Sequence, residues 1–109
     1  MAVDKSLLAG SSTMLVLKLL SEKDMYGYEM IETLRSRSQN VFELKAGTLY
    51  PILHAFEAKN YLTSYESEGI GKVRKYYSIT DEGRKFLKSK VNEWETYSAA
   101  VANVLAFGV

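Results

Sequence analysis

The chain has 109 residues and a formal net charge of +1; 47% of its residues are hydrophobic, 25% are charged and none is cysteine. This length suits one domain, and this composition excludes a disordered chain, a disulfide framework and a thiolate metal site. The longest apolar run, Met14 to Leu20, contains Lys18 and is far shorter than the roughly 20 residues that span a bilayer, so we expect a cytoplasmic protein with no membrane contact.

The N-terminal part of the chain predicts two helices. Asp4 or Ser6 can cap a first helix that ends near Glu22. Its leucines are too dense for a single apolar stripe, so we expect this helix to be buried on more than one side. After a turn, Asp24 can cap a second helix. The apolar residues of that helix that should face inward are Met30, Ile31 and Leu34.

The stretch "GTLYPILHAFEAKN" predicts a third helix, which Asn60 can end. Four apolar residues follow the i, i+3, i+4, i+7 pattern of a helix with one buried face: Leu49, Ile52, Leu53 and Phe56. The opposite face is small and weakly polar, and no acidic residue lies at its centre. Such a face can approach a phosphate backbone or a groove floor closely, and the free N–H groups of the first turn can bind a phosphate.

Four polar side chains of this third helix predict contacts to DNA. Thr48 and Tyr50 can donate hydrogen bonds to phosphates, and Lys45 and His54 can reach base edges. The alternative is an amphipathic helix whose polar face meets only solvent.

Two segments rich in Tyr, Thr, Val and Ile, "YLTSYESE" and "KVRKYYSI", predict a hairpin with "GIG" as its flexible loop. Residues 72–90 hold seven of the 14 basic side chains of the chain. Three of these lie at the tip of the hairpin, where they can bind phosphates: Lys72, Arg74 and Lys75. The alternative is an ordinary solvated hairpin, which Glu66 and Glu68 on the first strand favour.

Thr80 can cap a last helix that runs from residue 81 to about residue 106. The order of three helices, a two-stranded ribbon and a long helix predicts a winged helix-turn-helix, a mainly α fold of the α+β class. We expect residues 1–80 to form the DNA-binding domain and residues 81–109 to form a dimerisation helix, packed together as one compact unit.

The last helix carries a heptad seam of apolar residues. Alternating steps of four and three connect the seam, and neighbouring residues broaden it: Leu87, Val91, Trp94, Ser98, Val101 and Leu105, with Tyr97, Ala100 and Val104. The winged-helix core is complete before this helix ends, so its distal half should expose an apolar face. A homodimer buries that face and presents two reading heads to a pseudo-palindromic site. The alternative is a helix that folds back onto its own domain.

Three stretches, "MYGYEMIETL", "GTLYPILHAFEAKNYL" and "GKVRKYYSITDEGRKFL", together resemble the PadR family of bacterial transcriptional regulators, over about residues 7–105. The resemblance implies a dimeric winged-helix repressor of target promoters, often its own, of the short type with a single C-terminal dimerisation helix. It also implies that double-stranded DNA is contacted by the third helix and by the wing. The matching positions are Lys45, Thr48, Tyr50, Lys72 and Arg74.

Some members of this family resemble multidrug sensors, in which tryptophans of the two dimerisation helices form a flat hydrophobic pore. Trp94 matches that tryptophan, so the resemblance implies a small hydrophobic or aromatic effector at the dimer interface. The residues implied for this site are Gly10, Thr13, Met14, Val91, Trp94 and Ser98. The alternative is that Trp94 only packs the dimer.

The sequence predicts no enzyme, no metal site and no cofactor. It contains one histidine and no cysteine, glycine-rich phosphate loop or nucleophile elbow. A second function stays open, a winged helix that binds protein without binding an operator, because the net charge is small.

Overall fold

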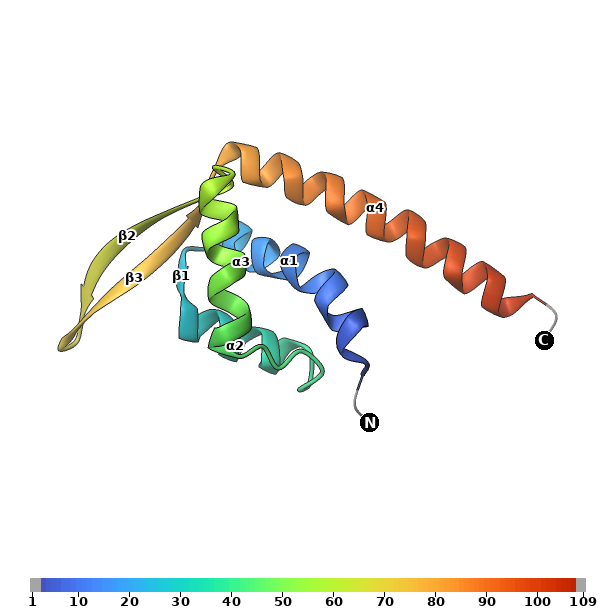
Figure 1. Cartoon of the computed structure of the whole chain (residues 1–109), viewed down its shortest axis with the longest axis horizontal. Coiled ribbons are helices and arrows are strands. Elements are labelled where there is room, and N and C mark those ends of the chain that lie inside the picture. Colours follow the sequence, from blue (N-terminus) through green and yellow to red (C-terminus); the bar gives the residue numbers. More distant parts are fainter. Residues whose placement is uncertain (1–2, 108–109) are drawn as a thin grey trace.

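The structure is a computed structural model that describes residues 3–107. Its elements, in chain order, are α1 (Lys5–Glu22), β1 (Met25–Tyr26), α2 (Gly27–Arg37), α3 (Ala46–Ala58), β2 (Leu62–Gly69), β3 (Lys72–Ile79) and α4 (Asp81–Ala106). In Figure 1, the β2–β3 hairpin projects to one side of the helical body as a wing, and α4 extends to the other side. The helix pair α2–α3 followed by this hairpin is a winged helix-turn-helix, so the predicted fold class is confirmed.

One apolar core joins the helices to the base of the wing. Most residues of the predicted inner faces of α2 and α3 are buried in it, together with the second half of α1: Val16, Leu17, Leu19, Leu20, Met30, Leu34, Leu49, Leu53 and Phe56. Ile31 and Ile52, which were also predicted to face inward, are half-buried and pack against this core. The expectation that α1 is buried on more than one side holds only for its second half. Leu7 is 66% exposed, because the first turns of α1 extend beyond α2 and α3 (Figure 1).

A third strand, which the sequence did not predict, borders the wing. β1 pairs antiparallel with β3, with Met25 opposite Tyr77 and Tyr26 opposite Tyr76, so the sheet order is β1-β3-β2. The expectation that Asp24 caps α2 is therefore wrong, and Tyr26 occupies the N-cap position. The sequence could not show this strand because two residues are too few for an alternating pattern.

The predicted ends of α1, α3 and α4 are confirmed by local geometry. Asp4 Oδ1 accepts a hydrogen bond from the backbone N–H of Ser6 at 2.8 Å, and Thr80 Oγ1 accepts one from the N–H of Gly83 at 3.0 Å. Asn60 follows α3 with a left-handed φ of 62°. The Thr80 hydroxyl also donates to the carbonyl of Asn60 at 2.7 Å, which ties the start of α4 to the end of α3.

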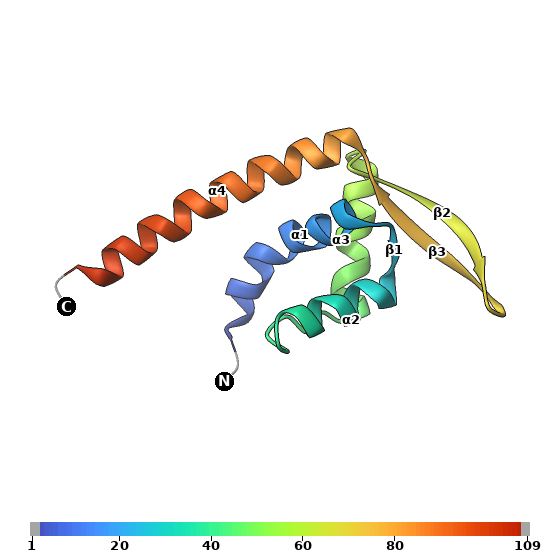
Figure 2. The ribbon, with the colours of Figure 1, turned by 180° about the vertical axis from the view of Figure 1, so that it is seen from behind.

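The helix α4 packs on the body with its first half and then continues past it. Leu87 is buried and Val91 packs against the core. The last turns of α4 project beyond the other described elements in both Figure 1 and Figure 2, and the molecule measures 59 × 32 × 21 Å. Within residues 3–107, no helix combines the length and the apolar character needed to cross a membrane.

Candidate nucleic-acid interface

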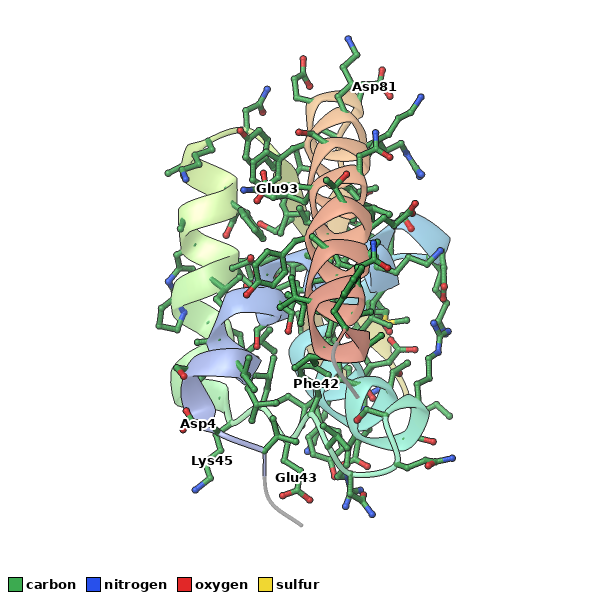
Figure 3. All side chains as sticks on the ribbon, turned by 90° about the vertical axis from the view of Figure 1, so that its right-hand side faces the viewer. Asp4, Phe42, Glu43, Lys45, Asp81 and Glu93 are labelled. Atoms are coloured by element: carbon green, nitrogen blue, oxygen red, sulfur yellow. The ribbon has the colours of Figure 1, made fainter. Side chains whose placement is uncertain are left out.

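The exposed side of α3 carries three of the residues that were predicted to contact DNA, and the fourth, Lys45, is the N-cap residue just before this helix. Lys45, Thr48, Tyr50 and His54 are all exposed, and Figure 3 shows Lys45 pointing away from the body at the start of α3. The first turn of α3, which lies wholly within the described chain, has no acidic residue and its N-cap makes no side-chain bond. The N–H of Thr48 donates to the carbonyl of Lys45 at 2.9 Å, so the N–H groups that precede it and the positive end of the helix dipole are open to an anion such as a phosphate.

The side chain of Tyr50 is held in place by α2. Its hydroxyl lies against Gly27, the first residue of α2, and leaves no room there for a Cβ atom. Gly27 is buried, whereas Tyr50 is 39% exposed and its ring centroid is 6.4 Å from that of His54. One side of Tyr50 is therefore packed and the other is open. Sequence reasoning missed this role of Gly27, although a glycine in the first turn of a helix can mark a place where another group closely approaches the backbone.

The register of the wing separates its charged side chains onto two faces. Residues paired across β2 and β3 point to the same side, and Ser67 is opposite Arg74 while Gly69 is opposite Lys72. We call this side the basic face; among the described residues of β2 and β3 on it, none is a carboxylate. The charged residues of the other side, which we call the mixed face, are Glu66, Glu68 and Lys75.

Lys75 is thus separated from the two other basic residues of the predicted tip. Its ammonium group lies 3.9 Å from the carboxylate of Glu57 on α3 and 5.4 Å from the ring centroid of Tyr77. Successive residues of a strand point to opposite sides, so Arg74 and Lys75 cannot share a face. The structure brings Lys72 and Arg74 together and places Lys75 beside α3.

One tyrosine from each strand forms a row across the basic face. The ring centroids of Tyr26 and Tyr76 are 5.5 Å apart in an edge-to-face arrangement, and those of Tyr76 and Tyr65 are 5.7 Å apart and stacked. The Tyr65 hydroxyl donates to Asp24 Oδ2 at 2.7 Å, and this bond raises the pKa of Tyr65. The guanidinium carbon of Arg74 lies 4.5 Å from the ring centroid of Tyr26. This tyrosine row ties the wing to the segment that precedes α2.

The residues predicted for the dimer interface fall into two groups. Leu87 is buried and Val91 is half-buried, and both pack on the core of their own chain. The other five are exposed along α4: Trp94, Tyr97, Val101, Val104 and Leu105. We call these five the apolar stripe. A contiguous exposed apolar surface of this kind usually marks a site of interaction with another molecule.

A cavity of about 370 Å³ lies between α1 and α4. Four of the six residues that the resemblance implied for an effector site line it: Gly10, Thr13, Met14 and Trp94. The other two do not, since Val91 borders a separate hollow of about 350 Å³ and the Ser98 hydroxyl donates to the main-chain carbonyl of Glu95 at 3.3 Å. The cavity wall also holds an ion pair between Lys90 and Glu93 at 3.5 Å, which sequence reasoning missed.

The side chains predicted to contact DNA offer hydrogen-bond donors and cations. Within residues 3–107, no three side chains of His, Asp or Glu converge in a way that could hold a metal ion. His54, the one histidine of the chain, is exposed beside Tyr50.

Comparisons with known proteins give consistent matches over most of the chain. The model of the Transcriptional regulator PadR-like family matches residues 16–89. The solved structure of a transcriptional regulator from Clostridium thermocellum is 32% identical with a TM-score of 0.86, and the match covers 94% of this chain and 97% of that one. A PadR family transcriptional regulator from Eggerthella lenta is 33% identical with a TM-score of 0.83, covering 94% and 88%. A protein of Lysinibacillus sphaericus described as uncharacterized is 36% identical over 93 residues, which are 84% of this chain and 85% of that protein.

Proposed function

The chain belongs to the PadR-like family of transcriptional regulators, and from that membership we propose that it is a dimeric repressor that binds pseudo-palindromic promoter sites. Membership itself implies regulation of transcription through DNA binding. The observation that carries the proposal is that one molecule exposes both the polar side of α3 and the basic face of the wing. These are the two surfaces that a winged helix offers to a duplex.

In this proposal, α3 enters the major groove and contacts both backbone and bases. Thr48 and Tyr50 donate to phosphates, which sets the register of the protein on the duplex. Lys45 and His54 reach base edges and supply the sequence preference. The exposure of all four side chains supports these roles, as does the packing of Tyr50 against Gly27, which restricts the ring on one side before DNA arrives.

The wing adds phosphate contacts through Lys72 and Arg74 on its basic face. On that face the strands β2 and β3 contribute no carboxylate, because Glu66 and Glu68 point to the other side. Lys75 contributes less to DNA binding in this proposal, since Glu57 already holds its ammonium group at 3.9 Å. A wing with few cations and no base-reading amide acts as a clamp on the backbone rather than as a reader of sequence.

We assign dimerisation to α4, with residues 1–80 as the DNA-binding part and residues 81–109 as the dimerisation helix. The apolar stripe supports this assignment, because Trp94 is 48% exposed, Val104 is 74% exposed and Leu105 is 70% exposed. Covering such side chains contributes about 25 cal/mol for each Å² of apolar surface removed from water, which amounts to several kcal/mol for a few residues. A two-fold axis near Trp94 then presents two reading heads to two half-sites.

For release from DNA, we propose a small hydrophobic or aromatic effector that binds between α1 and α4. The cavity of about 370 Å³ there has Trp94 and Tyr97 as aromatic walls, and Lys90 and Glu93 as its ionic pair. Trp94 also belongs to the apolar stripe, so a ligand against it would alter the contact between protomers. Because Trp94 is the one tryptophan of the chain, quenching of its fluorescence by planar aromatic compounds tests the site directly.

DNA binding is tested by selection of duplexes from a random-sequence library with the full chain. We expect enrichment of a pseudo-palindromic duplex whose affinity falls steeply as the salt concentration rises, because each neutralised phosphate releases counterions. If no duplex is enriched even at low salt, the repressor function is wrong and a protein-binding winged helix becomes the better proposal. A reporter fused to the upstream region of the chain's own gene then tests repression.

A further inference from the structure

Two consecutive residues, Tyr26 and Gly27, each contact one of the two proposed DNA-binding elements. The ring of Tyr26 lies under the guanidinium group of Arg74 on the wing, with its centroid 4.5 Å from the guanidinium carbon. The backbone of Gly27 lies against the hydroxyl of Tyr50 on α3. Tyr26 ends β1 and Gly27 begins α2, so a single peptide bond joins these two contacts.

Arg74 is positioned on the basic face mainly by Tyr26. The guanidinium group lies over the Tyr26 ring, and Nη1 also lies near Gly69, 3.7 Å from where a Cβ atom of that residue would be, which is ordinary contact distance. The Arg74 side chain is half-buried. A planar guanidinium group that stacks on an aromatic ring keeps the N–H groups of its edge available to a phosphate.

Tyr26 is itself immobilised by the tyrosine row. Its ring packs edge-to-face on Tyr76, which stacks at 13° on Tyr65. Tyr65 is then anchored by the hydrogen bond from its hydroxyl to Asp24 at 2.7 Å. The row starts and ends in the segment 24–26, so the ring of Tyr26 has a defined direction relative to the start of α2.

On the helix side, Gly27 provides the seat for Tyr50. The absence of a side chain at Gly27 lets the Tyr50 ring approach the backbone of α2, since a Cβ atom there would collide with both the hydroxyl and the ring carbon that bears it. The contact with Gly27 therefore orients Tyr50 relative to the same short segment that positions Arg74.

We propose that the Tyr26–Gly27 dipeptide sets the distance and direction between the wing cation and the α3 donor, and that Tyr26 is a positioning residue for DNA binding which does not itself touch DNA. This inference rests on the proposed function. A duplex presents its phosphates at a fixed spacing, so two donors bind it together only if their separation is set in advance. The tyrosine row performs that task for Arg74, and Gly27 performs it for Tyr50.

The test compares Tyr26→Leu with Tyr26→Phe, using the duplex that the wild-type chain selects. Tyr26→Phe keeps the ring and should bind within twofold of wild type. Tyr26→Leu should weaken binding by about three- to tenfold and should lower the slope of log K against log salt by about 1, because Arg74 then fails to hold its phosphate. Arg74→Ala should produce the same two changes, and the double variant should lose nothing further.

A purely structural role for Tyr26 would lower the melting temperature without changing the salt slope, which overturns the proposal. If Tyr26→Leu fails to fold, Tyr26→Met replaces it, since methionine is unbranched and packs adaptably but offers no ring to the guanidinium group. Tyr26→Met should then show the reduced slope, and a wild-type slope would overturn the proposal. Failure of the wild-type chain to bind any duplex would contradict the repressor function instead, so the two failures are distinguishable.

Discussion

The hydroxyl of Tyr50 on α3 lies against Gly27, the first residue of α2, so closely that Gly27 has no room for a side chain. This contact gives the first prediction. Gly27→Ala should lower the free energy of unfolding by about 1 kcal/mol, because the obstructing group is the far end of a side chain that can swing aside. Urea unfolding measures this loss. Adding Tyr50→Phe should recover part of it, and no recovery would place the strain elsewhere.

Tyr50 itself should matter for DNA binding. Tyr50→Ala is expected to weaken binding to all duplexes by about 1 kcal/mol, as the loss of one phosphate hydrogen bond does. The measurement is the affinity for the selected duplex and for an unrelated one of the same length. An unchanged affinity for both would remove Tyr50 from the contacts, and a loss confined to the selected duplex would make it a base reader.

Gly83 contacts backbone rather than a side chain, so its substitution should cost more. A Cβ atom on Gly83 would collide with the main-chain carbonyl of Tyr61 and with the side chain of Ile79. Because the backbone cannot swing aside, Gly83→Ala should lower the free energy of unfolding by about 3 kcal/mol. The matched control is Gly10→Ala, since among the described residues no atom outside the backbone of its own helix and its chain neighbours lies within 4 Å of a Cβ built there. That control should be neutral or stabilising by up to about 1 kcal/mol.

A substitution at Trp94 tests whether two protomers meet through the apolar stripe of α4. Trp94→Asp places a charge in the centre of the apolar stripe and should yield a monomer that no longer binds the selected duplex. Sedimentation equilibrium measures the mass, and the helix content of the monomer should match that of the wild-type chain. Lys88→Asp is a control on the same helix, outside the stripe. A stable Trp94→Asp dimer would show that the protomers meet elsewhere.

The ionised carboxylate of Glu22 makes the free energy of unfolding depend on pH. The hydrogen bonds from Arg37, at 2.9 Å for Nη1, together with the charges of Arg37 and Lys18, lower the pKa of Glu22. A lowered pKa in the folded state adds stability that is complete above the unfolded value of about 4.5 and is lost as the pH falls through the folded value. Glu22→Gln should therefore be slightly less stable than wild type at pH 7 and equal to it at pH 2.

The control for this pH effect is Glu95→Gln, because the described residues provide no ion-pair partner for Glu95. Its difference from wild type in unfolding free energy should be small at both pH values. An equally large difference for Glu22→Gln at pH 7 and pH 2 would mean that the charge of Glu22 is not what stabilises the fold.

Much of the fold followed from local signals in the sequence. The caps at Asp4 and Thr80 and the left-handed residue Asn60 are found where they were expected. Caps and helix-ending residues act on the backbone within three or four positions of themselves, so the chain order alone reveals them. The sequence did not predict β1, because its pairing with β3 joins residues about 50 positions apart and such a short strand has no recognisable local pattern.

The candidate site, like the fold, could be predicted from local sequence only in part. The sequence by itself identified the basic residues Lys72, Arg74 and Lys75 and the polar side of α3, because charge and helical periodicity are properties of the chain order. Which of these groups lie together depends on how the folded chain packs. Strand register put Lys75 beside Glu57, away from Arg74, and packing placed Tyr26 and Gly27 between the wing and α3. Strand register and side-chain packing arise from contacts between segments that are distant in the chain. A local pattern of residues does not show which distant residue each side chain will contact.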